Sequence, residues 1–428
     1  MDKKIKIDAL ARVEGHGGIT VEIKDNKVEN VRVEIYEGPR LIETLVIGKT
    51  PEEDLNIVPR ICAICTISHR YAAIRGLEKA LGIDPPEKVK LLRELMHLGE
   101  MLESHSLHVF VLALPDFLGY SSVIAMIDKY KDDVVKALQL KKYANKIMRV
   151  VSGRMIHGEN PIVGGFGKFP TKKELLEIKE EAKKMLPIAE RGVEIMASLD
   201  YPDYAEANTV FMCLNPPNGE FGFVGDSLLF STGEEYDVEK YKEAFSERVV
   251  SYSFAKRSRY KGQPFSVGAL ARINNIGDRL KGKAGAYYRK YHDDKWLVNP
   301  IYNNLAQAIE MVYCLEEIPK LIDKIVKMPD CEIVKPERLT GTGTGSVEAP
   351  RGTLLHHYEI KDYKITKSDI ITPTAMNLDD IERYIRIAAE KLVERKEIES
   401  MNLQLEMIAR AYDPCISCSA HLVKVIRK

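Results

Sequence analysis

The 428-residue chain lacks net charge and any long apolar run. Lys plus Arg and Asp plus Glu both number 63, so no overall field favours nucleic acid, an anionic membrane surface or an acidic partner. The most apolar run, 107–114, contains His108 and is followed by Pro115 and Asp116. It is too short and too polar to span a bilayer. We expect no membrane insertion, and function has to come from local sites.

The start of the chain also lacks a signal-peptide pattern. It reads MDKKIKIDALARVEG, with charges but no apolar stretch of the necessary length. We therefore expect a cytoplasmic protein.

The seven cysteines are too few and too unevenly spaced for a disulfide scaffold. Four of them form two Cys-x-x-Cys pairs, at 62–65 and 415–418. The others, Cys213, Cys314 and Cys331, stand alone, and we expect them to be inert thiols.

Hydrophobic periodicity predicts an α+β fold that is mostly α, with a core of long helices. Residues 1–50 are β-rich and alternate in the manner of a small antiparallel sheet, with a turn at Asp25-Asn26. Irregular segments with strand-like fragments are expected at 208–235 and 329–362. Because the two cysteine pairs have to meet in any shared site, we predict one intertwined domain over 1–428. The period of three to four residues predicts helices at 87–114, 123–151, 172–199, 303–326 and 378–412.

The two cysteine pairs supply four soft donors suited to zinc, iron-sulfur or nickel. A structural zinc site is the simplest alternative, but zinc ribbons bring their pairs together over short loops. Here almost the whole chain separates them. A thioredoxin-like dithiol needs a βαβ context that neither pair has. Spacing alone does not choose the metal.

The flanks of the pairs resemble the two signature motifs of nickel-iron hydrogenase large subunits. The first reads RICAIC, with His69 four residues on, and the second DPCISC, with His421 three residues on. The resemblance continues in family order through RVEGHGG, GPRLIE, ESHSLH, IHGENPIVGGFGK, EAPRG and ITPTAMNL. The sequences RICAIC and DPCISC are similar to those of the cytoplasmic archaeal and bacterial branch of the family. One departure is Ala63, where many members have glycine.

The resemblance implies a nickel-iron centre that reversibly and heterolytically cleaves dihydrogen. Cys62 and Cys415 would be terminal thiolates on nickel. Cys65 and Cys418 would bridge nickel to an iron carrying one carbon monoxide and two cyanides. A coordinated thiolate is a base already at the metal, and Cys415 is the expected first proton acceptor.

The same resemblance assigns the polar neighbours of the centre. Glu14 matches a proton-relay glutamate beside Cys415, and His69 would hydrogen-bond the Cys65 sulfur. Arg351, which follows Pro350, matches a donor to the iron ligands.

Two further residues complete this polar set. Thr374 matches a second donor to the iron ligands. Asp413 would hold the Arg351 guanidinium, with Asp116 as the lesser candidate.

A second metal position is implied near the C-terminus. Glu43, His421 and the Ile370 carbonyl match ligands of a magnesium or iron ion. In this family a maturation endopeptidase cuts after His421. We therefore expect removal of residues 422–428.

The glycine run at 341–345 and the Gly48-Lys49-Thr50 triplet do not fit nucleotide-binding loops. The chain also lacks the cysteines for iron-sulfur clusters of its own. The resemblance therefore implies an iron-sulfur small subunit, with further subunits that bind nicotinamide, deazaflavin or heterodisulfide. A structural zinc protein and a hydrogen sensor stay open as alternatives. A related quinone-reducing subunit normally lacks the four thiols.

Overall fold

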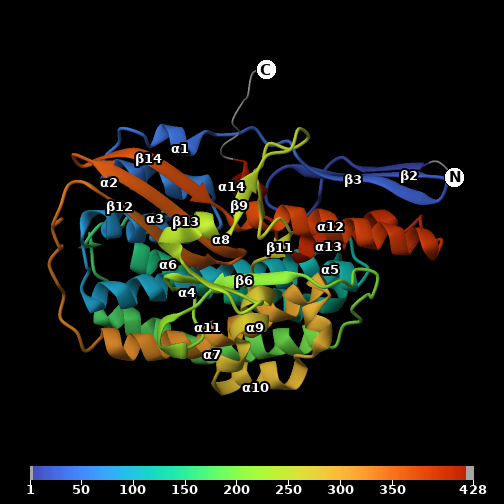
Figure 1. The fold of residues 1–428 in the computed structure, drawn as a ribbon. Coiled ribbons are helices and arrows are strands. Elements are labelled where there is room, and N and C mark those ends of the chain that lie inside the picture. Colours follow the sequence, from blue (N-terminus) through green and yellow to red (C-terminus); the bar gives the residue numbers. More distant parts are fainter. Residues whose placement is uncertain (1–2, 421–428) are drawn as a thin grey trace.

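The computed structural model describes residues 3–420. Its N-terminal part is a three-stranded antiparallel sheet of β1 (Lys3–Ile7), β2 (Gly17–Lys24) and β3 (Lys27–Ile35), in that order. Asp25 and Asn26 form the β2–β3 turn, both with positive φ, as a two-residue hairpin requires. The sheet projects to one side of the molecule in Figure 1, where it lies against α12. The predicted N-terminal sheet is confirmed.

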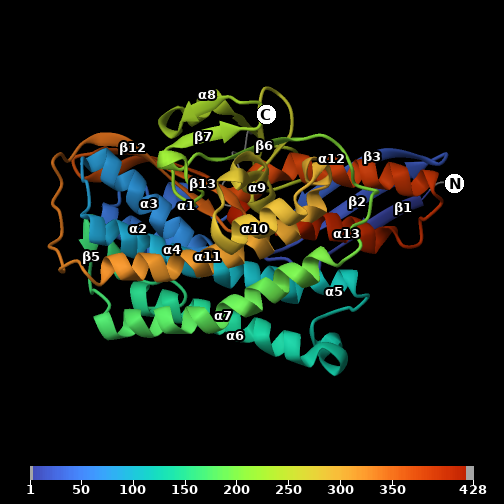
Figure 2. The same cartoon turned by 90° about the horizontal axis from the view of Figure 1, so that it is seen from below.

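Long helices build the main core, as the apolar period predicts. They are α4 (Glu87–Leu107), α6 (Ile127–Ser152), α7 (Lys172–Ala197) and α11 (Asn303–Ile325). Helix α4 packs against α6 and α11, and α7 packs against α6 and α11. Figure 2 shows these four helices side by side. The α+β fold with a helical core is therefore confirmed.

The fifth predicted helix, 378–412, is wrong as a single element. The chain forms α12 (Pro373–Glu394) and α13 (Met401–Ala411), separated by a turn in which Lys396 has a φ of 61°. Neither glycine nor proline marks this turn, and the apolar period continues on both sides of it. The sequence signal for a helix end was therefore absent.

The segment 329–362 is more regular than predicted. It contains β12 (Gly341–Ala349) and β13 (Gly352–Lys361), which join β14 (Lys364–Ile371) in an antiparallel sheet. Helix α3 (Thr66–Leu81), which was not predicted, packs against β12 and β13. Almost all residues of α3 are buried, so it shows no polar face by which an amphipathic helix is recognised.

The glycine run of β12 allows a close approach between this strand and α3. A Cβ on Gly345 would lie 1.9 Å from the Ala72 carbonyl oxygen, and one on Gly343 would lie 2.5 Å from the Gly76 carbonyl oxygen. The run therefore serves helix-sheet packing and not phosphate binding.

Substitution at Gly345 tests this packing. Gly345→Ala should lower the free energy of unfolding by about 3 kcal/mol, because backbone has to move to admit the methyl group. Thermal unfolding of the purified protein measures the effect. Gly38→Ala is the matched control, since nothing lies within 4 Å of its added Cβ. Equal melting temperatures for the two variants would contradict the packing argument.

The remaining elements are short, and Figure 1 labels most of them. Within residues 3–420 no helix combines the length and apolarity needed to cross a membrane. The segment 208–235 holds strand-like fragments as predicted. The other helices and strands are α1 (Ile42–Leu45), α2 (Pro51–Ile57), α5 (Leu114–Phe117), α8 (Tyr241–Ala244), α9 (Ala269–Ile276), α10 (Gly282–Tyr291), α14 (Ile416–Ser419), β4 (Pro161–Ile162), β5 (Gly165–Phe166), β6 (Val210–Leu214), β7 (Ser227–Phe230), β8 (Glu235–Asp237), β9 (Ser246–Arg248), β10 (Arg257–Arg259) and β11 (Phe265–Ser266).

Candidate metal centre

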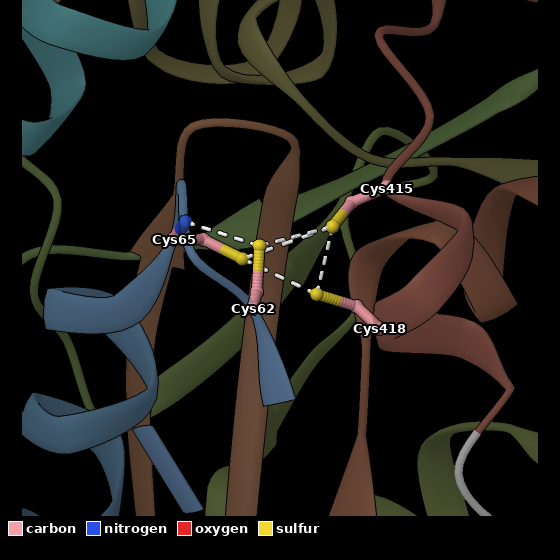
Figure 3. A group of neighbouring side chains, drawn as sticks. All are labelled: Cys62, Cys65, Cys415 and Cys418. Atoms are coloured by element: carbon pink, nitrogen blue, oxygen red, sulfur yellow. Dashed lines mark hydrogen bonds between the residues drawn. The ribbon is translucent and has the colours of Figure 1, made fainter. Parts of the chain in front are cut away.

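The four paired cysteines meet at one buried point, with all four sulfurs within 4.8 Å of one another. Cys62 and Cys65 lie just before α3, while Cys415 and Cys418 lie at the start and within α14. Figure 3 shows the four thiols pointing toward one another from these two segments. The Sγ–Sγ distances are 3.3 Å for Cys62–Cys415, 3.3 Å for Cys65–Cys418, 4.0 Å for Cys65–Cys415 and 2.8 Å for Cys415–Cys418.

The thiols do not ionise equally. The pKa of Cys62 is lowered by hydrogen bonds from its cysteine neighbours and by the Arg351 guanidinium. Burial raises the pKa of Cys65 to about 11, and it raises the pKa of Cys415 and Cys418 as well. All four thiols can therefore be ionised together only when cations are bound to them. Metal binding to cysteine generally releases the thiol proton in this way.

Glu14 lies directly beside the cluster. Its Oε2 is 3.1 Å from Cys415 Sγ and accepts a 3.0 Å hydrogen bond from the Ser417 amide. The backbone of Glu14 pairs with that of Cys415, and the Ile416 amide donates to the Glu14 carbonyl at 3.0 Å. The two distant ends of the chain thus hold this carboxylate at the sulfur.

Arg351 is held by Asp413, as the sequence predicts. Its Nε donates to the Asp413 carbonyl at 2.8 Å and its Nη2 to Asp413 Oδ1 at 3.0 Å. Pro350 lies in the turn between β12 and β13. Gln307, which the sequence analysis missed, donates to Asp413 Oδ2 at 3.2 Å. The lesser candidate, Asp116, contacts Arg12 and Arg410 instead.

One nitrogen of Arg351 is left over. Nη1 is buried and has no hydrogen-bond partner among residues 3–420, while three of the cysteines act electrostatically on this guanidinium. A buried donor without a partner is costly. An anionic group at the centre would satisfy it.

Thr374 and His69 contact the second cysteine pair. The Cys415 amide donates to Thr374 Oγ1 at 2.9 Å. His69 Nε2 lies 3.5 Å from Cys418 Sγ, so the predicted partner Cys65 is replaced by Cys418. The reason is that α3 carries His69 one turn beyond Cys65, toward the opposite pair.

Arg40 joins the two cysteine segments, and the sequence analysis assigned it no role. Its Nη2 donates to the Ile61 and Ser417 carbonyls, both at 2.6 Å. Its place in the GPRLIE motif was the only signal. His105 and His108 have packing roles, because their rings contact Glu310 and Gln307 respectively.

The second predicted metal position is partly described. Glu43 is buried, its Oε1 accepts from the Ile370 amide at 2.7 Å, and its Oε2 has no partner among the described residues. Lys256 Nζ lies 3.6 Å from Glu43 Oε1. Burial raises the pKa of Glu43. Glu43 and Ile370 are therefore in contact, through the amide of Ile370. His421 lies outside the described residues.

Comparison with known proteins agrees with this geometry. The family model described as nickel-dependent hydrogenase matches residues 40–132 and 228–421, which include both cysteine pairs, and a model described as HoxL-like matches 4–37.

Individual relatives match along nearly their whole length. The alpha subunit of sulfhydrogenase 1 of Pyrococcus furiosus is 42% identical over 422 residues, covering 98% of each chain. The matching chain of the vhu F420-non-reducing hydrogenase of Methanocaldococcus jannaschii is 33% identical, covering 90% of this chain and 99% of the relative. The crystal structure of an NAD+-reducing [NiFe]-hydrogenase in the H2-reduced state superposes with a TM-score of 0.90 at 27% identity, covering 98% of this chain and 99% of the other.

The buried four-sulfur cluster and these full-length matches lead to one conclusion. The chain belongs to the large-subunit family of the nickel-dependent hydrogenases, and it is an oxidoreductase of that family.

Proposed function

We propose that this chain is the catalytic subunit of a cytoplasmic nickel-iron hydrogenase that reversibly and heterolytically cleaves dihydrogen. The observation that carries the proposal is the convergence of four buried sulfurs within 4.8 Å. Cys62 and Cys415 are the proposed terminal ligands of nickel, and Cys65 and Cys418 the proposed bridges to iron. The chain is proposed to form one intertwined domain, since residues from both ends build the site.

The surroundings of the cluster suit an iron that carries one carbon monoxide and two cyanides. Arg351 Nη1, which has no partner among the described residues, could donate a hydrogen bond to such anionic ligands. Thr374 Oγ1 already accepts from the Cys415 amide, so its hydroxyl hydrogen is available to a second acceptor. Pro350 contributes by setting the turn that places Arg351.

When bound, the metal pair supplies Lewis acidity that polarises dihydrogen. The residues of the chain then move the proton. Cys415 is the proposed acceptor, and the Glu14 carboxylate, 3.1 Å away, takes the proton from its sulfur. Arg351 keeps its charge, because arginine is not deprotonated in proteins, and it acts by electrostatic positioning together with Asp413.

A magnesium or iron ion is proposed at the second position. Glu43 offers one oxygen without a partner among the described residues, and the Ile370 carbonyl and His421 are the other proposed ligands. Hard oxygen donors favour magnesium, and the histidine also permits iron.

Electrons are proposed to leave through an iron-sulfur small subunit. Among the described residues, no group of three or more possible metal ligands includes Cys213, Cys314 or Cys331, so these cysteines do not form a cluster site. Further subunits would bind nicotinamide, deazaflavin or heterodisulfide. A relative named as an NAD-reducing hydrogenase supports the nicotinamide alternative.

Infrared spectroscopy of the purified, matured protein tests the proposal directly. Metal-bound carbon monoxide and cyanide should give bands where protein does not absorb, and metal analysis should find nickel and iron. Hydrogen uptake with an artificial acceptor measures turnover. A single zinc ion without these bands would indicate the structural zinc alternative, and intact bands without turnover would indicate a hydrogen sensor.

Removal of the C-terminal tail is a further expected result. Intact-mass measurement of active enzyme should give a chain that ends at His421, cleaved by a maturation endopeptidase. Protein produced without nickel should retain Leu422–Lys428 and serves as the control. Active enzyme that carries the full tail would refute the proposed processing.

A further inference from the structure

A line of buried polar side chains leads away from Cys418 toward α2. None of the proposed catalytic steps uses its last three members. The successive distances are 3.5 Å from Cys418 Sγ to His69 Nε2, 3.0 Å from His69 Nδ1 to His356 Nε2, 2.9 Å from His356 Nδ1 to the Tyr358 hydroxyl, and 3.0 Å from that hydroxyl to Asp54 Oδ2.

The arrangement follows from the fold. His356 and Tyr358 are two residues apart on β13, so their side chains share one face, and that face packs against α3, which carries His69. His357 points the other way, to Thr344. His69 is 1% exposed, and His356, Tyr358 and Asp54 are 0% exposed. These side chains are therefore shielded from solvent, and each hydrogen bond constrains the next.

The direction of these hydrogen bonds is set at the sulfur. His69 is buried among neutral partners, where a charged imidazolium would be costly, so we take its ring as neutral with one N–H. A metal-bound Cys418 thiolate can only accept. When His69 donates to this sulfur, its N–H lies on Nε2 and its Nδ1 accepts from His356.

The same logic continues to the far end of the line. A neutral His356 that donates from Nε2 has to accept at Nδ1, which takes the single O–H of Tyr358. The Tyr358 oxygen can then only accept from Asp54, and this requires a protonated carboxyl. If Asp54 is ionised, the Tyr358 hydroxyl donates to its carboxylate instead of to His356. The N–H of His356 then moves to Nδ1, and the N–H of His69 also moves to Nδ1. His69 then presents a lone pair to Cys418.

The surroundings of Asp54 suit a carboxyl that gains and loses a proton. Its Oδ1 has no hydrogen-bond partner among residues 3–420. Burial raises the pKa of Asp54 to about 7, against the opposing effects of Tyr358 on β13 and Arg70 on α3. Placing the additional proton on His356 instead would bury a cation and leave this carboxylate with one oxygen unpaired.

We propose that Asp54 is a positioning residue for the metal centre. Its proton sets, through the two groups on β13, whether His69 donates a hydrogen bond to the Cys418 sulfur. This inference rests on the proposed nickel-iron centre. An N–H donated to a ligating sulfur withdraws electron density from the metals, so ionisation of Asp54 should increase the density on iron and lower the carbon monoxide stretching frequency.

The test follows the carbon monoxide band of the matured holoenzyme against pH in one fixed oxidised state. In the wild type the band should move to lower frequency as the pH rises through about 7. In Asp54→Asn it should stay at the wild-type low-pH position, because the amide group donates to Tyr358 as the acid does. Tyr358→Phe should also lose the pH-dependent shift. Tyr143→Phe is the control, since it removes another buried hydroxyl, which donates to the Ile178 carbonyl, and it should keep the shift.

Each outcome decides the inference. A wild-type pH-dependent shift that persists in Asp54→Asn or in Tyr358→Phe overturns it. If the wild type has no carbon monoxide band, the proposed function fails instead. The inference is then decided by the carboxylic acid C=O band in the infrared difference between wild type and Asp54→Asn. That band should be present below pH 7 and shift in D2O, and its absence overturns the inference.

Discussion

Cys415→Ser is expected to abolish hydrogen turnover and to reduce bound nickel to background. The hydroxyl is a harder, much less acidic donor than the thiolate, so it supplies neither the soft ligand nor the base. Loss of the proton acceptor alone should cost roughly 10³-fold in rate. Hydrogen uptake and elemental analysis of the purified variant measure the two effects.

Cys213→Ser is the matched control for this substitution. Cys213 is also fully buried, but it contacts Asn275 and not the cluster. It should retain nickel and turnover, with only a modest loss of stability. A Cys415→Ser protein that binds nickel and turns over normally would contradict the assignment of the site.

Glu14→Gln should lower turnover by roughly 10²- to 10⁴-fold while leaving nickel content unchanged. Glutamine is nearly isosteric and can still accept from the Ser417 amide, so the local structure should persist. It cannot take a proton from Cys415. Turnover and metal content, measured on the same preparation, separate proton transfer from metal loss.

Two further variants sharpen this test. Glu14→Asp keeps a titratable carboxylate at a greater distance and should restore part of the rate. Glu34→Gln changes a carboxylate on β3 that bonds Thr20, and it should behave as wild type. Full activity in Glu14→Gln would mean that the proton leaves Cys415 by another route.

Helices α6 and α7 could be predicted from the sequence because each has one apolar face, whereas α4 and α11 are buried over most of their surface and were predicted from the length of their apolar period. Helix α7 also has a readable start, where Thr171 and Glu174 form a capping box. Helix α3 is buried on almost all sides and was not predicted. Strand β12 begins with glycines, which are uncommon in strands. The α12–α13 turn lacked the residues that normally mark a helix end. These elements depend on tertiary packing, which local patterns do not encode.

The residues of the candidate site likewise fall into those that the sequence predicted and those that it did not. The four cysteines, Glu14, Arg351 and Asp413 lie within recognisable motifs, and the structure brings them together. The contact of His69 with His356 joins residues 287 positions apart, and no periodicity could have indicated it. The same holds for Gln307 beside Asp413. Side chains that support the site from other elements were therefore missed, and so was Arg40, although it lies inside the GPRLIE motif.

The separation of the two cysteine pairs has a consequence for biosynthesis. Cys62 and Cys415 are 353 residues apart, so a nascent chain carries only two of the four cluster thiols until the segment with Cys415 and Cys418 leaves the ribosome. Domains usually begin to fold during synthesis, from the N-terminal side. A site with all four thiols therefore cannot form before α14 has been synthesised, and the space around Cys62 and Cys65 has to stay open to nickel until α14 closes over it.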